Sequence, residues 1–270
     1  MRPLSDGWPE LANVLGVGVS AIDMADALRR AEGLLQQRCK GYICLTGVHG
    51  VMEAQRDETL RDILNRSFLC LPDGMPTVWV GHLQGHPAMG RVYGPDFMLQ
   101  LCKLSARHGY RNFLYGGKYG VAEILRAQLE VLIPAIDIVG TYTPPFRPLT
   151  TSEEEQLIAR INQSRPDIIW VGLSTPKQER FMAQYIARLE THLMVGVGAA
   201  FDIHAGLLAD APQWVKDCGL QWLDRLRQEP RRLGRRYLTN NPRFLWQIAL
   251  QLSGLKRSEG EPLSRFQHLS

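Results

Sequence analysis

An aspartate that directly follows an apolar run is the first candidate for chemistry in this sequence. Asp73 comes after the run 68–71 and lies in the triplet Pro72-Asp73-Gly74. In such a turn the Asp side chain commonly bonds to its own backbone. At the mouth of a cleft the same carboxylate can act as a general base. The residues alone leave both interpretations equally open, and His49 is a second titratable candidate at a neighbouring strand end.

Glycines at the ends of apolar runs form a second group of candidates. Gly116 and Gly117 stand between an apolar run and a helical pattern, and Lys118 follows them. Backbone N–H groups at such a helix start can bind a phosphate, and the lysine would add charge. The loop lacks the spacing of a Walker A motif, so a tight turn that binds nothing stays open as the alternative. Tyr142 and Gly172, which end two further runs, are expected at the same nucleotide site.

Polar side chains near two later runs are further candidates. Gln178 can donate and accept hydrogen bonds to sugar hydroxyls or a diphosphate, whereas Glu179 is favourable at a helix start through the helix dipole alone. Asp202 would either bond to a ribose or a base, or cap a helix. The stretch 196–202 is similar to the start of a dinucleotide fingerprint but has Phe201 at the third glycine position. An oxidoreductase that uses NAD is therefore kept as an alternative.

Six apolar runs rich in Ile, Val and Leu must position these residues. Most of them are continuous rather than alternating, as in strands buried on both faces, and helical patterns separate them. This alternation predicts an α/β fold, with a mostly parallel, Rossmann-like sheet flanked by helices. The loops after parallel strands meet at one edge of the sheet, where ligands bind. The runs are 41–47, 67–74, 111–117, 136–142, 167–173 and 192–202.

Helix signals lie between and before these runs. The segment 151–164 opens with Ser152 and Glu155 at the spacing of a capping box. A later helix is expected to begin with Pro176 in its first turn. The N-terminal segment predicts a short strand, followed by a helix from about Asp23.

A basic segment follows the predicted sheet. Residues 213–257 contain ten Lys and Arg against three acidic residues, although the whole chain has a net charge of only +4. The segment is amphipathic, and Pro230 and Pro242 are expected to divide it into short helices, the last of about ten residues. Such a segment needs an anionic partner, and we expect a membrane surface. A core-docking helix pair and a contact between copies in a homo-oligomer are alternatives, whereas no recognised nucleic-acid-binding module accompanies the charge.

Composition sets the broad class. Hydrophobic residues make up 45% of the chain and charged residues 21%, as in ordinary globular proteins. The five cysteines form no Cys-x-x-Cys pair, which predicts reduced thiols in a cytosolic protein rather than a disulfide framework or a zinc site. No signal peptide and no apolar run of about 18 residues is visible. We expect a catalytic core over 1–212, a basic helical appendage over 213–255 and a disordered tail over 256–270.

With these segments in order, the chain resembles the WecG/TagA/CpsF family of bacterial glycosyltransferases over about residues 13–240. Each motif is weak alone, but their order and spacing together are specific. The motifs are PDGM (72–75), RVYGPD (91–96), FLYGGKYGVAE (113–123), VGLSTPKQE (171–179), GVGAAFDIHAG (196–206), APQWV (211–215) and QWLDRLRQEPRRLGRRY (221–237).

The resemblance implies an inverting, metal-independent transferase without a cofactor. Such an enzyme moves a sugar from a UDP-sugar onto a sugar carried on a polyprenyl diphosphate, at the inner face of the cytoplasmic membrane, in cell-surface or exopolysaccharide synthesis. By their positions in the family motifs, Asp73 is the proposed base and Gln178 a second catalytic residue. The further residues that the resemblance places near substrate are Thr46, Arg225, Arg232, Arg235 and Arg236.

One departure from the family pattern concerns the donor sugar. The family has an Asn two residues after the position of Thr46, whereas this chain has Val48, followed by His49. An N-acetylmannosamine-type donor and another hexose are therefore both open. Outside this family, the alternatives are the NAD-dependent oxidoreductase and a non-enzymatic, basic-tailed binding protein.

Overall fold

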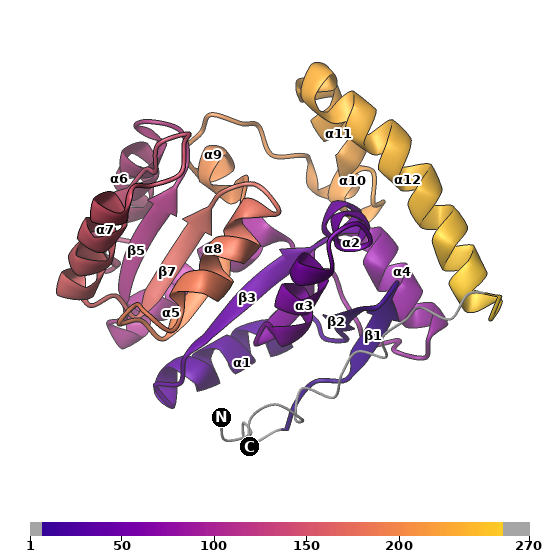
Figure 1. Ribbon diagram of the computed structural model, residues 1–270, viewed down its shortest axis with the longest axis horizontal. Helices are drawn as coiled ribbons and strands as arrows, with labels where there is room; N and C mark the ends of the chain where they lie inside the picture. Colours follow the sequence, from indigo (N-terminus) through magenta and orange to yellow (C-terminus); the bar gives the residue numbers. More distant parts are fainter. Residues whose placement is uncertain (1–6, 256–270) are drawn as a thin grey trace.

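A six-stranded parallel sheet forms the centre of the computed structural model, which describes residues 7–255 apart from the side chains of Gln213, Asp217, Arg232 and Arg236. The strand order is β4-β3-β8-β7-β5-β6, and every neighbouring pair is parallel (Figure 1). The predicted fold class is therefore confirmed. The strands are β3 (Gly41–Thr46), β4 (Leu69–Pro72), β5 (Arg111–Gly116), β6 (Asp137–Tyr142), β7 (Ile168–Gly172) and β8 (Leu193–Gly196).

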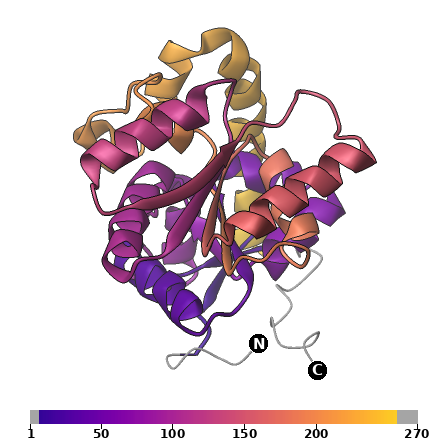
Figure 2. The same cartoon turned by 90° about the vertical axis from the view of Figure 1, so that its left-hand side faces the viewer.

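Helices cover both faces of this sheet because successive strand residues enter different apolar clusters (Figures 1 and 2). In β3, Ile43 and Leu45 join one cluster, while Tyr42 and Cys44 join the other. This is why the strands read as continuous apolar runs. The first cluster contains α1 (Met24–Gln36), α5 (Gly94–His108), α6 (Val121–Leu132) and α9 (Ala200–His204), and the second contains α2 (Val48–Ala54), α3 (Glu58–Arg66), α7 (Thr151–Ser164) and α8 (Lys177–Tyr185).

The N-terminal segment forms two strands rather than the single predicted one. β1 (Leu11–Val14) and β2 (Val17–Ser20) pair as an antiparallel hairpin. The following helix α1 starts where it was expected, because the Asp23 side chain accepts a hydrogen bond from the Asp26 N–H and caps it.

The predicted capping box of α7 is wrong by two residues. Thr150 is the N-cap, with its hydroxyl accepting from the Glu153 N–H at 3.3 Å, while the Glu153 carboxylate accepts from the Thr150 N–H at 2.8 Å. Ser152 already lies inside the helix. Both pairs have the spacing of a capping box, and the extended backbone at Thr150 decides between them. Helix α8 starts one residue later than predicted, because Pro176 is its N-cap rather than part of its first turn.

The basic segment contains α10 (Gln213–Asp217), α11 (Gln221–Gln228) and α12 (Pro230–Leu252). Pro230 starts α12, as expected of a helix divider, but Pro242 lies inside this helix, which continues for 23 residues instead of about ten. The turn after Pro242 is held by packing, because Phe244 and Ile248 are 2% and 7% exposed. Tertiary contacts thus offset the missing backbone donor of the proline.

Helix α12 is docked on the core of the molecule. Phe244 and Ile248 belong to the second apolar cluster, and α12 packs against α2. Near its end, the Gln251 side chain accepts from the Leu15 N–H in the hairpin turn and donates to the Asn13 carbonyl of β1. These contacts agree with the alternative in which the basic segment docks on the core. Within residues 7–255, no helix combines the length and apolarity needed to cross a bilayer.

Candidate active site

The loops that follow the six parallel strands meet in a cleft of about 1870 Å³ at one edge of the sheet. Because all six strands run in the same direction, their carboxyl ends share this edge, as the sequence predicts. The basic segment forms the opposite wall of the cleft, through Trp222, Arg225 and Tyr237. Core and appendage therefore enclose the cleft together.

Asp73 lies in this cleft directly after β4. Its carboxylate oxygen Oδ1 accepts from the Gly94 N–H at 3.0 Å, and its own N–H donates to the Thr46 carbonyl. The Asp73 side chain therefore does not bond to its own turn, which removes the simpler of the two interpretations of this residue. No described residue bonds to the second oxygen, Oδ2, which leaves a carboxylate fixed at one oxygen and free to accept a proton at the other.

The two polar candidates near β3 occupy different places. Thr46 is 2% exposed, and its hydroxyl accepts from the Cys70 thiol, so it supports the cleft from beneath. His49 lies on α2 and lines the cleft. Its Nδ1 is 3.3 Å from the Asn240 amide of α12 and 3.8 Å from the Glu53 carboxylate. His49 is thus part of the contact between the core and the appendage.

The glycine loop after β5 is held by the neighbouring strand. Gly116 has a φ of +124°, and a Cβ atom there would lie 2.6 Å from the Gly172 carbonyl oxygen, so only glycine fits. The Gly117 N–H donates to that same carbonyl at 2.9 Å and is therefore not available to a phosphate in this conformation. Lys118 is exposed and lines the cleft beside Gly117. Lys118 therefore places a cationic side chain in the cleft, whereas the Gly117 N–H is already paired within the fold.

Phe201 explains why the stretch 196–202 does not have the geometry of a dinucleotide fingerprint. Its ring is fully buried and packs against Gly172 and Gly117, where any Cβ on Gly172 would lie 2.4 Å from it. The position that a third glycine would occupy is therefore filled by the buried ring of Phe201, beneath the cleft. Asp202, the next residue, lines the cleft from α9.

Gln178 and Glu179 form a buried polar pair at the start of α8. Gln178 lines the cleft, and its amide donates to the Glu179 carboxylate at 3.1 Å; the Thr175 hydroxyl donates to the same oxygen. Gln178 Oε1 and Glu179 Oε2 are buried and have no described partner. Burial raises the pKa of Glu179, which is 1% exposed. Glu179 is therefore not a surface residue placed for the helix dipole.

The remaining candidates differ in their position relative to the cleft. Tyr142 is not among the lining residues and stacks between Tyr115 and the Arg160 guanidinium. Arg225 lines the cleft, lies 3.6 Å from Glu229, and has a buried Nε without a described partner. Arg235 is exposed on α12 and does not line the cleft. The side chains of Arg232 and Arg236 lie outside the described part of the chain.

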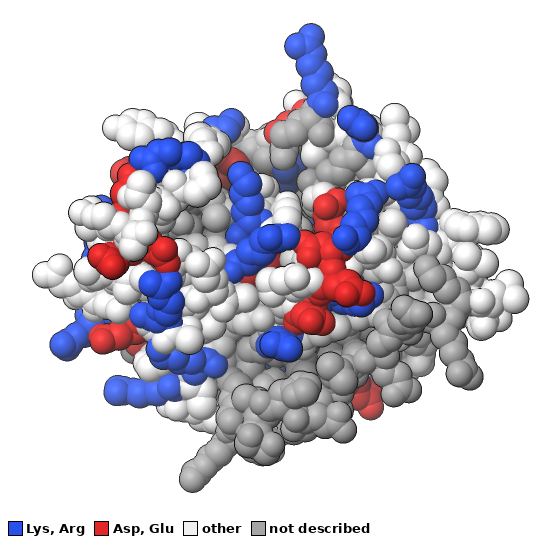
Figure 3. Space-filling model, viewed as in Figure 1, with Lys and Arg blue, Asp and Glu red and all other residues white. Residues whose placement is uncertain are grey.

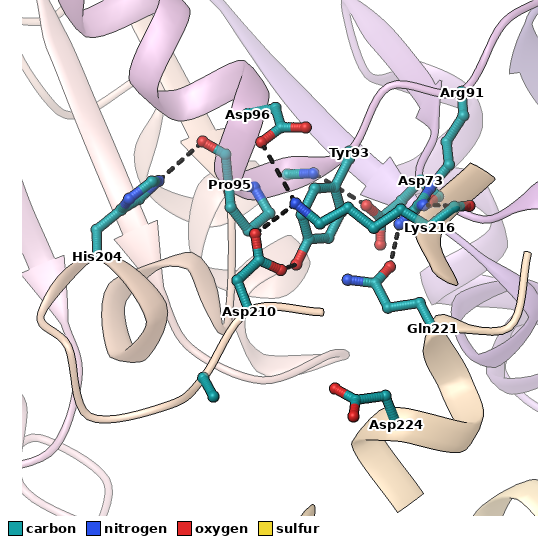
Figure 4. A network of polar contacts seen from close by, with 12 residues as sticks. Asp73, Arg91, Tyr93, Pro95, Asp96, His204, Asp210, Lys216, Gln221 and Asp224 are labelled. Carbon is teal, nitrogen blue, oxygen red and sulfur yellow. Dashed lines mark hydrogen bonds and ion pairs between the residues drawn. The ribbon is translucent and has the colours of Figure 1, made fainter. Parts of the chain in front are cut away.

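A polar network that the sequence analysis did not predict connects Asp73 with the appendage (Figure 4). Its centre is Arg91, whose guanidinium lies 4.6 Å from the centre of the Tyr93 ring. The motif 91–96 was visible in the sequence, but two of the three acceptors of its arginine lie more than a hundred residues further along the chain. The other members of the network are Tyr93, Asp96, Asp210, Lys216 and Gln221.

The fold and the cleft together define an α/β protein with an open cleft at the carboxyl ends of its parallel strands, the place where ligands bind in such folds. Lys118 and Arg225 supply positive charge, and Asp73, in the loop after β4, and Gln178, at the start of α8, supply hydrogen-bond acceptors. Among the described residues, no group of three or more His, Cys, Asp or Glu side chains is arranged to hold a metal ion.

The chain belongs to the WecG/TagA/CpsF family of glycosyl transferases, whose model matches residues 12–258. The resemblance seen in the sequence motifs is thus confirmed. It favours a glycosyltransferase over the oxidoreductase and over the binding protein, in agreement with the buried Phe201 in the would-be dinucleotide loop.

Named relatives from two bacterial genera share this similarity. A protein of Bacillus subtilis (strain 168) is 30% identical over 197 residues, which cover 73% of this chain and 75% of the relative. A protein of Staphylococcus aureus (strain MW2) is 26% identical over 198 residues, with the same coverage of 73% and 75%. Both relatives are named N-acetylglucosaminyldiphosphoundecaprenol N-acetyl-beta-D-mannosaminyltransferase.

Proposed function

We propose that this protein is an inverting, metal-independent glycosyltransferase, which moves a sugar from a UDP-sugar onto a sugar linked to a polyprenyl diphosphate. The observation that carries the proposal is the Asp73 carboxylate, held at Oδ1 by the Gly94 N–H inside a cleft that also contains Lys118 and Arg225. The names of the relatives support the lipid-linked acceptor.

The reaction follows from these positions. Asp73 takes the proton of the acceptor hydroxyl, and the oxygen attacks the anomeric carbon of the donor as the bond from that carbon to UDP breaks. The proton stays on Asp73, and the electron pair of the broken bond leaves on the diphosphate. The cleft-lining side chains of Lys118 and Arg225 can bind that developing charge. Gln178 would hold a sugar hydroxyl, and Asp202 the nucleoside.

The donor sugar is the finer question. An N-acetylmannosamine-type donor agrees with the names of the relatives. Val48 and His49 stand where the family has an Asn, next to the base loop, and this difference leaves another hexose equally compatible. His49 contacts Asn240 of α12, so we propose that the cleft near β3 is shaped partly by the appendage.

A lipid-linked acceptor has to be reached at a bilayer surface. Helix α12 buries one face on the core and leaves several large apolar side chains exposed on its other faces, which is the arrangement of an interfacial helix. We therefore assign the anionic membrane contact to this helix, on the cytoplasmic side, where nucleotide sugars are available. The exposed apolar residues of α12 are Leu238, Leu245, Trp246 and Leu252.

A transfer assay tests the proposed function. The purified protein is incubated with a sugar-diphosphate-lipid acceptor and one UDP-sugar at a time, with and without EDTA. The mass of the product is measured by mass spectrometry and its anomeric configuration by NMR. We expect one class of UDP-sugar to extend the acceptor by one sugar, with an inverted anomeric centre and at the same rate with EDTA. Calorimetry with UDP and with NAD provides the comparison. Tight binding of NAD without any binding of UDP would reverse the assignment.

A further inference from the structure

Arg91 binds to three acceptors that belong to two different parts of the chain (Figure 4). Its Nε donates to the Asp73 carbonyl at 2.8 Å, and its Nη1 donates to the Lys216 carbonyl at 3.2 Å. Its Nη2 donates to the side chain of Gln221, the first residue of α11. The rigid fork of one guanidinium therefore joins the loop of the candidate base to α10 and α11.

The segment that carries Arg91 also holds the carboxylate of Asp73. The Gly94 N–H donates to Asp73 Oδ1, and the Val92 N–H donates to the Pro72 carbonyl at 2.8 Å. The main chain and the side chain of Asp73 are thus both fixed by residues 91–94. A displacement of this segment would move the carboxylate relative to the cleft.

The appendage contacts the same segment at a second point. Lys216 is 8% exposed; its Nζ bonds to Asp210 and lies 4.8 Å from the centre of the Tyr93 ring. The Tyr93 hydroxyl donates to Asp210 at 2.7 Å, and burial together with this carboxylate raises the pKa of Tyr93, so the hydroxyl keeps its proton. Asp96 lies 3.9 Å from the Lys216 ammonium. The buried Lys216 side chain therefore fixes the appendage to 91–96 through charged contacts with carboxylates that are partly exposed.

We infer that Arg91 is a positioning residue that couples the docking of α10 and α11 to the placement of the Asp73 carboxylate. The inference rests on the proposed role of Asp73 as base. When the appendage is undocked, Arg91 loses two of its three acceptors and is no longer held against the Asp73 carbonyl. A reacting group that is misplaced by about 1 Å can cost about 100-fold in rate. The base and the appendage that meets the lipid-linked acceptor thus reach their working positions together.

The test removes the appendage side of the contact and leaves Arg91 in place. Gln221→Ala should lower kcat about tenfold, with the donor KM changed less than about twofold, because the base moves while donor binding is kept. It should also speed hydrogen exchange of the Gly94 amide, which donates to Asp73. Gln221→Glu keeps an acceptor for Arg91 and should retain several times the kcat of Gln221→Ala. Gln156→Ala, the same change at an exposed site on α7, is the control.

A double-mutant cycle separates coupling from two independent defects. Arg91→Ala should lower kcat by about 10- to 100-fold. Adding Gln221→Ala to this variant should lower kcat little further, because both substitutions remove the same contact between Arg91 and Gln221. If the two effects multiply, or if Gln221→Ala keeps wild-type kcat and Gly94 exchange, the coupling is wrong. If the wild type transfers no sugar, the proposed function falls, and the exchange of the Gly94 amide in Gln221→Ala still decides whether the appendage fixes Asp73. Should Arg91→Ala not fold, the kcat, the donor KM and the Gly94 exchange rate of Gln221→Ala decide whether the coupling exists.

Discussion

The carboxyl group of Glu179 shows how tertiary structure changes what a residue does. At the start of a helix, a glutamate is stabilised by the helix dipole in any protein. Here the side chain is 1% exposed, and one of its oxygens has no described partner. The Glu179 carboxylate accepts a hydrogen bond from the side-chain amide of Gln178, which lines the cleft. The protonation of Glu179 and the orientation of this amide are therefore linked.

This burial predicts a pH dependence of stability. Desolvation raises the pKa of Glu179 in the folded protein above the 4.5 of an unfolded-state glutamate. As the pH rises above 4.5, the unfolded chain therefore loses this proton while the folded protein still holds it. The free energy of unfolding falls over this range until the folded carboxyl also ionises. Glu179→Gln removes this loss. Its stability relative to the wild type, measured by urea unfolding, should therefore increase as the pH rises from 4.5 toward neutrality. Parallel pH curves for the two proteins would contradict this, and Glu58→Gln, an exposed glutamate of α3, is the control.

The sequence predicted the candidate residues better than their contacts. Asp73, Gln178, Lys118 and Asp202 all line the cleft, because each follows a strand or starts a helix at the same sheet edge. Arg91 could not be predicted as their partner. Its acceptors Lys216 and Gln221 lie 125 and 130 positions away, and only the docked appendage brings them together.

At the scale of elements, continuous apolar runs identified the six parallel strands, since strands buried on both faces need apolar residues at every position. Local sequence signals were less reliable for helix ends, where more than one residue is compatible with the start or the end of a helix. Thr150 and Ser152 both have an acidic residue three positions later, and Pro242 is compatible with a helix end. Helix α12 continues past Pro242 because Phe244 and Ile248 are buried against the core. This burial depends on tertiary contacts, which the local sequence pattern does not reveal.

The capping box of α7 gives a direct test at this scale. Thr150→Ala should lower the free energy of unfolding by about 1 kcal/mol, because the Glu153 N–H loses its acceptor. Ser152→Ala should change it by less than about 0.5 kcal/mol, since that hydroxyl lies inside the helix and, among the described residues, bonds to the Gln156 amide rather than to a backbone N–H. Urea midpoints of the two variants make the comparison. Equal losses would mean that the helix starts two residues later.

At the scale of the whole molecule, the docked appendage is the feature that the sequence left most open. The basic segment 213–257 contains ten Lys and Arg against three acidic residues, yet on the face shown in Figure 3 Lys and Arg are interspersed with Asp and Glu. We therefore expect the apolar side chains of α12 to contribute strongly to membrane binding, alongside the charge. Helix α6, which carries the exposed Val131, lies at the opposite end of the molecule (Figure 1).

Vesicle binding tests this expectation. Trp246 is 67% exposed, so Trp246→Ser should leave the fold intact and weaken cosedimentation with anionic vesicles by about tenfold, through lost apolar burial. Val131→Ser, at a side chain that is 80% exposed on α6, should bind as the wild type does. Equal binding of all three proteins would place the membrane contact elsewhere.

The central claim, that the Asp73 carboxylate is the base of a sugar transfer, is tested most directly by Asp73→Asn. The asparagine keeps an oxygen that can accept from the Gly94 N–H, so the loop stays in place while the proton acceptor is lost. Transfer from the UDP-sugar to the lipid-linked acceptor should fall by about 100- to 10,000-fold, while Asp62→Asn, an exposed aspartate of α3, keeps the wild-type rate. A transfer rate in Asp73→Asn equal to that of the wild type would contradict the account.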